Sequence, residues 1–216
     1  MSGMSVMTDD TLTLAILAGG RGSRLGGVDK ASLVVGGRTL LERQLTGLGP
    51  LAREVVVVAN DDRLTGDPRF RVILDPDPHA GVLPALLAAL DTATSELVLL
   101  VACDMPFVAP GVAEELVRFA TGYDAVVPDV DGHLQPMLAV YRVEPCRAAI
   151  RASLAADNRR MIGFLDDVKT FRVPERALTP VVAHVSRSFF NVNTPDDLAE
   201  AERIYAETRL TYRPPA

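Results

Sequence analysis

A glycine-rich segment carrying three cationic side chains follows a short apolar run near the start of the chain. Residues 17–30 read Leu-Ala-Gly-Gly-Arg-Gly-Ser-Arg-Leu-Gly-Gly-Val-Asp-Lys, which places Arg21, Arg24 and Lys30 among five glycines. Glycine allows the backbone to approach a ligand closely, and successive backbone N–H groups in such a loop form a concavity that binds anions. Three cations against the single carboxylate of Asp29 also make the loop locally positive. The segment therefore predicts a binding site for a polyphosphate.

Two common phosphate-binding patterns do not fit this segment. The dinucleotide pattern G-x-G-x-x-G, begun at Gly20, requires glycine where the chain has Leu25. The P-loop pattern G-x-x-x-x-G-K-[ST], begun at Gly22, requires lysine where the chain has Val28. A mobile surface loop is the plain alternative, but flexible linkers rarely follow a core strand with cations placed in this way. The loop is therefore expected to belong to a third kind of phosphate site.

The elements that must position this loop follow from the apolar pattern of the chain. Apolar runs predict strands at Leu12–Ala18, Glu54–Ala59, Arg71–Leu74, Leu97–Ala102, Ala125–Val127 and Met137–Tyr141. Their continuous valine and leucine content is typical of strands that are covered on both faces. Because amphipathic helical patterns lie between these runs, we expect a three-layer α/β/α fold with a mostly parallel sheet.

Three helices are indicated clearly by caps and apolar stripes. Thr39 is the expected N-cap of a helix with apolar residues at 40, 41, 45 and 48, and Pro110 precedes a second stripe at 112, 116 and 119. Thr194 caps the last helix, which has proline at its first position and apolar residues at 198, 201 and 205. Residues 143–183 are less regular, and there we expect helices at about Glu144–Leu154 and Arg159–Asp166 with one or two strands.

Polar residues stand directly after several of the predicted strands. Besides the loop at 19–30, these are Asn60, Asp75 and Asp104. Ligands of open α/β sheets bind outside the carboxyl ends of the strands. Four separate segments are therefore expected to meet at one edge of the sheet and to form a site there.

The loop resembles the signature L-A-G-G-x-x-x-R-M-G-G-x-D-K of the molybdenum cofactor guanylyltransferases, a branch of the small nucleotidylyltransferases. Leu25 stands where this family usually has methionine, a change that conserves volume. Asn60 and Asp75 stand where the family has nucleotide contacts at strand ends. Further segments resemble family blocks, namely Cys103–Phe107, Gln135–Arg142, Arg159–Ile162 and Phe189–Leu198. The Asn-Val-Asn-Thr-Pro run in the last block is more similar to the guanylyl branch than to the cytidylyl branch.

The resemblance implies a Rossmann-like nucleotidyltransferase fold and a Mg²⁺-dependent transfer of GMP from GTP to the terminal phosphate of molybdopterin. It implies catalytic roles for Arg24, Lys30 and Asp104, with Asp104 as the Mg²⁺ ligand. Nucleotide contacts are implied for these three residues and for Leu17, Ala18, Gly19, Gly20, Asn60, Asp75 and Gly81. Contacts with the second substrate are implied for Arg159, Arg160, Asn191 and Asn193. Transient contacts with other proteins of molybdenum cofactor synthesis are implied as well.

The chemistry implied by the resemblance requires no general base. A phosphate monoester has a second pKa of about 6, so the acceptor is largely dianionic at neutral pH and already nucleophilic. His79, His133 and His184 accordingly form no recognisable pairing of a base with a residue that orients it.

One block departs from the family pattern and leaves the choice of nucleotide open. The family usually reads Gly-Pro-Leu-Ala-Gly, whereas this chain has Gly-Val-Leu-Pro-Ala from Gly81 to Ala85. Pro84 suits the first turn of a helix, but the methyl group of Ala85 would crowd a base lying against that backbone. A cytidylyltransferase, another small-molecule nucleotidyltransferase and a non-catalytic nucleotide-binding protein therefore remain alternatives.

The candidate residues also have plain structural interpretations. Asp104 before Met-Pro is a common turn composition, and Asn60 and Asp75 taken alone are ordinary strand-end residues. Asn191 and Asn193 suit the turn that enters a helix, and Arg159 and Arg160 suit a solvated surface.

Composition limits the class of protein. The chain has 216 residues, of which 48% are hydrophobic and 23% charged, as in a globular domain that forms one core. We expect a single domain over residues 11–208, with a disordered tail at 1–10 and a flexible tail at 209–216. A net charge of −6 argues against non-specific nucleic-acid binding, and no apolar stretch is long enough to span a bilayer. Two cysteines without metal or disulfide spacing favour a reducing cytoplasm.

Overall fold

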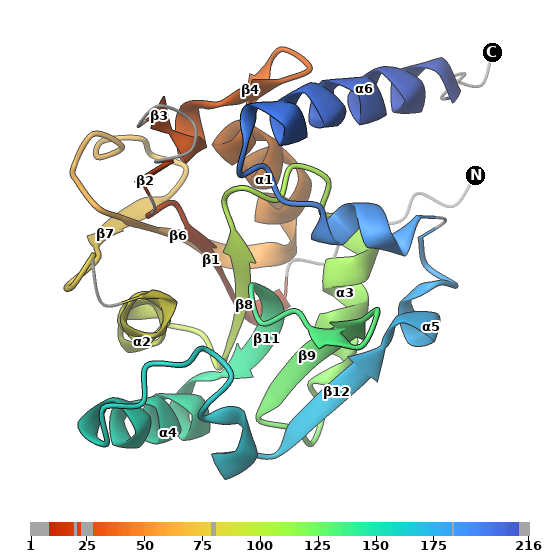
Figure 1. Cartoon of the computed structure of the whole chain (residues 1–216). Coiled ribbons are helices and arrows are strands. Elements are labelled where there is room, and N and C mark those ends of the chain that lie inside the picture. Colours follow the sequence, from red (N-terminus) through yellow and green to blue (C-terminus); the bar gives the residue numbers. More distant parts are fainter. Residues whose placement is uncertain (1–8, 20, 23–27, 79–80, 183, 212–216) are drawn as a thin grey trace.

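A twisted sheet of eight strands forms the centre of the molecule in the computed structural model (Figure 1). The structure describes residues 9–19, 21–22, 28–78, 81–182 and 184–211. The strands of the sheet are β1 (Asp9–Leu17), β6 (Ala52–Ala59), β7 (Arg71–Leu74), β8 (Leu97–Ala102), β9 (Ala125–Val130), β10 (His133–Leu134), β11 (Leu138–Arg142) and β12 (Thr170–Pro174). Each predicted strand is present, within a few residues of its expected bounds.

The sheet is mostly parallel, as predicted. Its strand order is β10-β9-β11-β8-β1-β6-β7, and β12 pairs with β9. β1 is parallel to β6 and β8, β6 is parallel to β7, and β12 is parallel to β9. Only β10 and β11 run antiparallel to the strands that they join in this sheet. The chain leaves β1 toward β6 and returns to its other side at β8, so a topological switch point lies beside β1.

Helices cover both faces of the sheet and give the expected three layers (Figure 1). The helices are α1 (Leu40–Leu48), α2 (Val82–Thr92), α3 (Pro110–Phe119), α4 (Val143–Ala155), α5 (Glu175–Leu178) and α6 (Pro195–Thr211). Successive residues of a strand point to opposite faces. Leu14 and Ile16 of β1 thus pack in the core that contains α1, α3 and α6, whereas Ala15 and Leu17 pack in the core that contains α2 and α4.

The strand register brings the ends of four parallel strands to one level. Leu17 at the end of β1 pairs with Val58 of β6 on one side and with Ala102 of β8 on the other. Ala59 at the end of β6 pairs with Leu74 at the end of β7. The polar segments that follow these strands therefore leave the sheet at the same edge.

The predicted helix starts are confirmed by their caps. The Thr39 hydroxyl accepts a hydrogen bond from the Glu42 N–H, and the Glu42 carboxylate accepts one from the Thr39 N–H, which makes a capping box for α1. At α6 the Thr194 hydroxyl accepts from the N–H of Asp197 at 3.1 Å. The two best-defined helix entries of the sequence are thus set by local hydrogen bonds.

One predicted helix is wrong. Residues 159–166 form turns and the start of a 3-10 helix (Leu165–Asp167) instead of an α-helix. Gly163 lies against the side chain of Asn158, where a Cβ would come within 2.6 Å of the amide nitrogen, so the turn brings these two residues into close contact. β1 begins at Asp9 and α6 continues to Thr211. Among the described residues, no helix has the length and apolar character needed to cross a membrane.

The C-terminal helix is held against a hairpin formed by β4 (Val34–Val35) and β5 (Arg38–Thr39). The two turn residues, Gly36 and Gly37, have φ values of 60° and 78°, as a two-residue turn between twisted strands requires. The Gly36 N–H donates to Glu202 at 3.0 Å, and a Cβ on Gly36 would lie 2.2 Å from the ring of Tyr205. Glycine is therefore needed at 36 both for the turn and for the docking of α6.

This arrangement predicts different effects of alanine at the two turn positions. Gly36→Ala is expected to lower the free energy of unfolding by about 3 kcal/mol, because it adds overpacking against Tyr205 to the strain of a positive φ. Gly37→Ala has open space around it and is expected to cost about 1 kcal/mol, from backbone strain alone. Equilibrium unfolding in urea measures both values. Equal losses in the two variants would contradict the proposed contact.

Candidate active site

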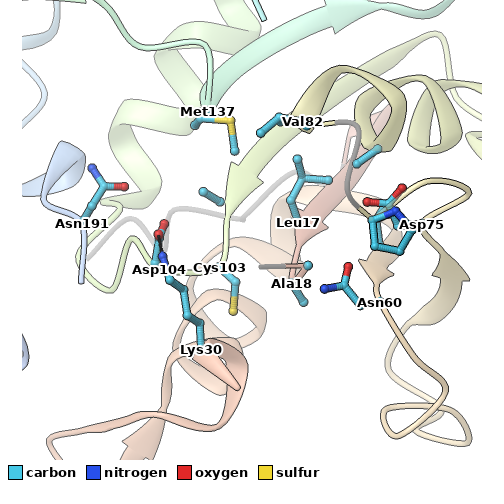
Figure 2. A pocket seen from close by; sticks show the side chains of 16 residues that line it. Leu17, Ala18, Lys30, Asn60, Asp75, Val82, Cys103, Asp104, Met137 and Asn191 are labelled. Atoms are coloured by element: carbon cyan, nitrogen blue, oxygen red, sulfur yellow. Dashed lines mark hydrogen bonds and ion pairs between the residues drawn. The ribbon is translucent and has the colours of Figure 1, made fainter. Parts of the chain in front are cut away.

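A cavity of about 340 Å³ opens at the carboxyl edge of the sheet, beside the switch point (Figure 2). Eight of the residues expected to contact a nucleotide line it, namely Leu17, Ala18, Gly19, Lys30, Asn60, Asp75, Gly81 and Asp104. The other two, Gly20 and Arg24, lie outside the described residues. The segments that the sequence placed after separate strands are therefore brought together around one cavity.

Lys30 and Asp104 form an ion pair at one end of the cavity (Figure 2). The Lys30 Nζ lies 2.7 Å from the Asp104 Oδ2, and the side chains are only 19% and 15% exposed. The same ammonium donates a second hydrogen bond to the Oδ1 of Asn193, at 2.6 Å. Lys30 begins a short 3-10 helix (Lys30–Ser32) whose first turn is capped by the Asp29 carboxylate through the N–H of Ala31. The glycine-rich segment at 17–30, which is expected to bind phosphate and is called the phosphate loop below, is thus fixed at Lys30, its last residue.

The turn that carries Asp104 is held from two sides. The buried side-chain amide of Gln44 in α1 donates to the carbonyl oxygens of Ala102 and Met105, at 2.5 and 3.3 Å. The Val192 N–H donates to the carbonyl oxygen of Asp104 at 2.9 Å. These bonds place the Asp104 carboxylate at the cavity wall without using its own oxygens.

The second carboxylate oxygen of Asp104 suits a cation. Oδ1 is buried and has no hydrogen-bond partner among the described residues, which is costly for a charged group unless a ligand compensates it. No cluster of three or more His, Cys, Asp or Glu side chains in the described part of the chain could hold a metal ion by itself. Mg²⁺ typically takes one or two carboxylates and completes its shell with water and phosphate oxygens. The lone Asp104 carboxylate therefore fits Mg²⁺ that arrives with a phosphorylated substrate.

Asn60 and Asp75 lie at the opposite end of the cavity (Figure 2). The Asp75 N–H donates to the carbonyl oxygen of Ala59 at 2.8 Å, which continues the β6–β7 ladder by one residue. Gly19 passes so close to Asn60 that a Cβ on it would lie 2.6 Å from the amide oxygen. This close approach explains why the loop has glycine at position 19. The polar side chains of Asn60 and Asp75 line the cavity at this end.

Apolar residues outside the expected set of nucleotide contacts complete the wall. Val82 and Ala85 line the cavity from the first turns of α2, together with Met137 and Cys103. Burial raises the pKa of the Cys103 thiol far above its usual value, so this thiol stays protonated and acts as an apolar side chain. Val82 and Ala85 are three residues apart, so they share one face of α2, and this spacing was the feature of the sequence that could have placed α2 in the cavity wall. Gln44 was also missed, although it shares the apolar face of α1 with Leu41 and Leu48.

The four residues expected at a second substrate lie in different places. Asn191 lines the cavity near Asp104, with its amide donating to the Phe189 carbonyl oxygen at 2.9 Å. Asn193 contacts Lys30, as described above. The Arg159 side chain is half exposed, and its Nε lies 3.3 Å from the Asp157 Oδ1 and its Nη1 3.8 Å from the Asp77 Oδ2. Arg160 is also exposed. Neither arginine lines the cavity, so the structure brings together the two asparagines but not the arginines.

Comparison with known proteins relates this fold and cavity to nucleotidyltransferases. A family model described as "MobA-like NTP transferase domain" matches residues 14–168. A probable molybdenum cofactor guanylyltransferase of Pelotomaculum thermopropionicum is 38% identical over 201 residues, covering 93% of this chain and 96% of the relative. A molybdenum cofactor guanylyltransferase of Rhodopseudomonas palustris is 37% identical over 216 residues, covering 92% of this chain and 96% of the relative.

A solved structure agrees with these sequence matches. The crystal structure of molybdopterin-guanine dinucleotide biosynthesis protein A from Archaeoglobus fulgidus superposes with a TM-score of 0.77 at 29% identity, and it covers 90% of this chain and 99% of that chain. The residues that the family model matches, 14–168, include Lys30 and Asp104. The chain thus belongs to the MobA-like NTP transferase domain family and is a nucleotidyltransferase.

Proposed function

We propose that this enzyme transfers GMP from GTP to the terminal phosphate of molybdopterin, releasing pyrophosphate and forming molybdopterin guanine dinucleotide. The observation that carries the proposal is the Lys30–Asp104 pair with its unpartnered carboxylate oxygen, placed inside a cavity at the switch point of the sheet. A cation and a metal-binding carboxylate at such a position suit a nucleoside triphosphate. The names of the relatives supply the specific nucleotide and acceptor.

The cavity has a polar end for the nucleoside and a charged end for the phosphates. We place the base and ribose near Asn60 and Asp75, and the triphosphate beside the Gly19 backbone and Lys30. The two adjacent N–H donors on the pairing edge of guanine match a carboxylate such as Asp75, since a carboxylate only accepts hydrogen bonds when ionised. Leu17, Val82 and Ala85 supply apolar contacts between the two ends.

The reaction requires positioning and charge neutralisation. An oxygen of the molybdopterin phosphate attacks the α-phosphorus of GTP, and the bond between that phosphorus and the α–β bridging oxygen breaks. The bonding electrons leave with pyrophosphate, so negative charge grows on the leaving group. The Lys30 ammonium stabilises this charge, and Arg24 is proposed to act with it. The acceptor phosphate is already largely dianionic at neutral pH, so it attacks without a base.

Mg²⁺ is proposed as the metal cofactor, with the Asp104 carboxylate as its protein ligand. When bound, it would neutralise phosphate charge and help to align the triphosphate. Asp104 itself contributes a fixed carboxylate, because Gln44 and Val192 hold the backbone on both sides of it.

The Ala85 side chain supports a second candidate nucleotide, CTP. The Ala85 methyl group stands in the cavity wall where the family pattern usually has glycine. A smaller pyrimidine base would tolerate this methyl group better than a purine would. CTP is therefore the alternative substrate.

A screen of four nucleoside triphosphates tests the function directly. With Mg²⁺ and molybdopterin present, we expect pyrophosphate release with GTP and less than about a tenth of that rate with ATP, CTP or UTP, because the Asp75 carboxylate favours guanine. The rates are measured by converting the released pyrophosphate to phosphate with a coupling enzyme and quantifying that phosphate. A preference for CTP would replace the guanylyl assignment, and no release with any nucleotide would support a non-catalytic binding protein.

The role of Lys30 has a matched control, because the chain has only one other lysine. Lys30→Ala is expected to lower kcat/KM for GTP by about 100-fold, since it removes a cation that neutralises the leaving group. Lys169→Ala is the control, because Lys169 lies over the ring of Tyr123 at 5.0 Å, away from the cavity. Steady-state kinetics measure both variants, and equal activity of the two would remove Lys30 from the mechanism.

Asp104→Asn tests the metal assignment with little change in shape. We expect product formation to fall by at least about 100-fold at saturating Mg²⁺, because the carboxylate charge that binds the metal is lost. Unfolding in urea should show a folded variant, since the bonds from Gln44 and Val192 that hold this turn are accepted by backbone carbonyl oxygens and not by the Asp104 carboxylate. A folded variant with an unchanged rate at every Mg²⁺ concentration would refute the role of Asp104.

A further inference from the structure

Asn193 joins the C-terminal part of the chain to the phosphate loop. Its Oδ1 accepts a hydrogen bond from the Lys30 Nζ at 2.6 Å, over a separation of 163 residues. The contact is at least as short as the one from Lys30 to Asp104, at 2.7 Å. The amide oxygen of Asn193 is therefore engaged by a catalytic candidate before any substrate binds.

The backbone around Asn193 is fixed by hydrogen bonds on both sides. The N–H groups of Asn193 and Thr194 both donate to the Asp197 Oδ2, at 2.9 and 2.8 Å. On the other side the Val192 N–H donates to the Asp104 carbonyl oxygen, and the Val192 side chain is fully buried. Asn193 thus presents its amide from a rigid helix entry, as a group that positions another must do.

The neutral amide oxygen of Asn193 can hold the Lys30 ammonium under conditions in which the ion pair with Asp104 is weakened. Lysine carries a hydrated charge on a flexible stem, and Asp104 would hold it less strongly after binding a cation. An amide oxygen keeps its hydrogen bond to the ammonium whatever the charge state of the neighbouring carboxylate. Since an ammonium has three N–H donors, Lys30 can keep Asn193 and still donate to a phosphate.

We propose that Asn193 is a positioning residue that holds the Lys30 ammonium at the phosphate end of the cavity, and that its amide oxygen does not bind the second substrate. The consequence for catalysis rests on the proposed nucleotidyl transfer, but the contact itself can be tested without any ligand. The Asn191 amide donates to the Phe189 carbonyl oxygen instead, and Asn191 is the matched comparison two residues away.

The two lysines of the chain allow a ligand-free test. An amine-reactive reagent is added to the intact protein, and the labelling rate of Lys30 is divided by that of Lys169 after peptide mass spectrometry. Asn193→Ala is expected to raise this ratio about fivefold, the fold-change that matches a hydrogen bond of about 1 kcal/mol. Asn191→Ala should leave the ratio unchanged. Asn193→Asp keeps an acceptor and should return the ratio to the wild-type value or below it.

The labelling result decides the inference on its own. A ratio unaffected by Asn193→Ala would overturn it, as would a rise of the same size in Asn191→Ala. Because Lys169 lies over the ring of Tyr123 and does not line the cavity, a change in the absolute rate at Lys169 identifies a variant that has lost its fold. In that case Asn193→Asp decides, since a raised ratio in this folded variant would also overturn the proposal.

Binding of GTP–Mg²⁺ without molybdopterin separates this inference from the proposed function. Isothermal titration calorimetry should show about fivefold weaker binding for Asn193→Ala, and Asn193→Ala should cause no further loss when it is added to Lys30→Ala. A second-substrate role predicts unchanged GTP binding and a raised KM for molybdopterin alone, which would overturn the inference. If the wild type itself does not bind GTP, the proposed function fails while the labelling result stands.

Discussion

The contact between Lys30 and Asp104 is the constraint around which the site is built. It joins the loop after β1 to the turn after β8, two segments 74 residues apart in sequence. Both side chains are largely shielded from water, so each charge needs the other, and leaving one without its partner would be costly. Because Asp104 uses one oxygen for this pair, its other oxygen is left buried and available to a cation. One ion pair thus positions both the phosphate contact and the metal ligand that we propose.

The scaffold holds this pair by elements from both ends of the chain. Parallel pairing of β1 with β6 and β8 sets the level at which the loops leave the sheet. Gln44 of α1 fixes the turn at Asp104 from one core, and the entry of α6 fixes it from the side of Val192. The helices therefore do more than cover the sheet, since two of them determine where the charged groups of the cavity stand.

Local patterns were sufficient to predict most of the fold and the residues that gather at its edge. Asn60, Asp75 and Asp104 could be placed because strand ends are readable from apolar runs, and parallel strands end at one edge. The helix expected at 159–166 is absent, and the segment instead turns so that Gly163 packs against the nearby Asn158, a local turn that the helical pattern did not reveal. The bond from Lys30 to Asn193 could not be foreseen, since no local rule pairs side chains separated by 163 residues.

The docking of α6 has a consequence for the order in which the protein matures. Tyr205 packs on the β4–β5 hairpin, and Asn193 reaches Lys30 just before that hairpin. A ribosome releases the chain from its N-terminal end, so every strand of the main sheet is synthesised before this last segment appears. The sheet can pair while Lys30 still lacks its bond to Asn193, and that bond forms only after the segment leading into α6 has been synthesised.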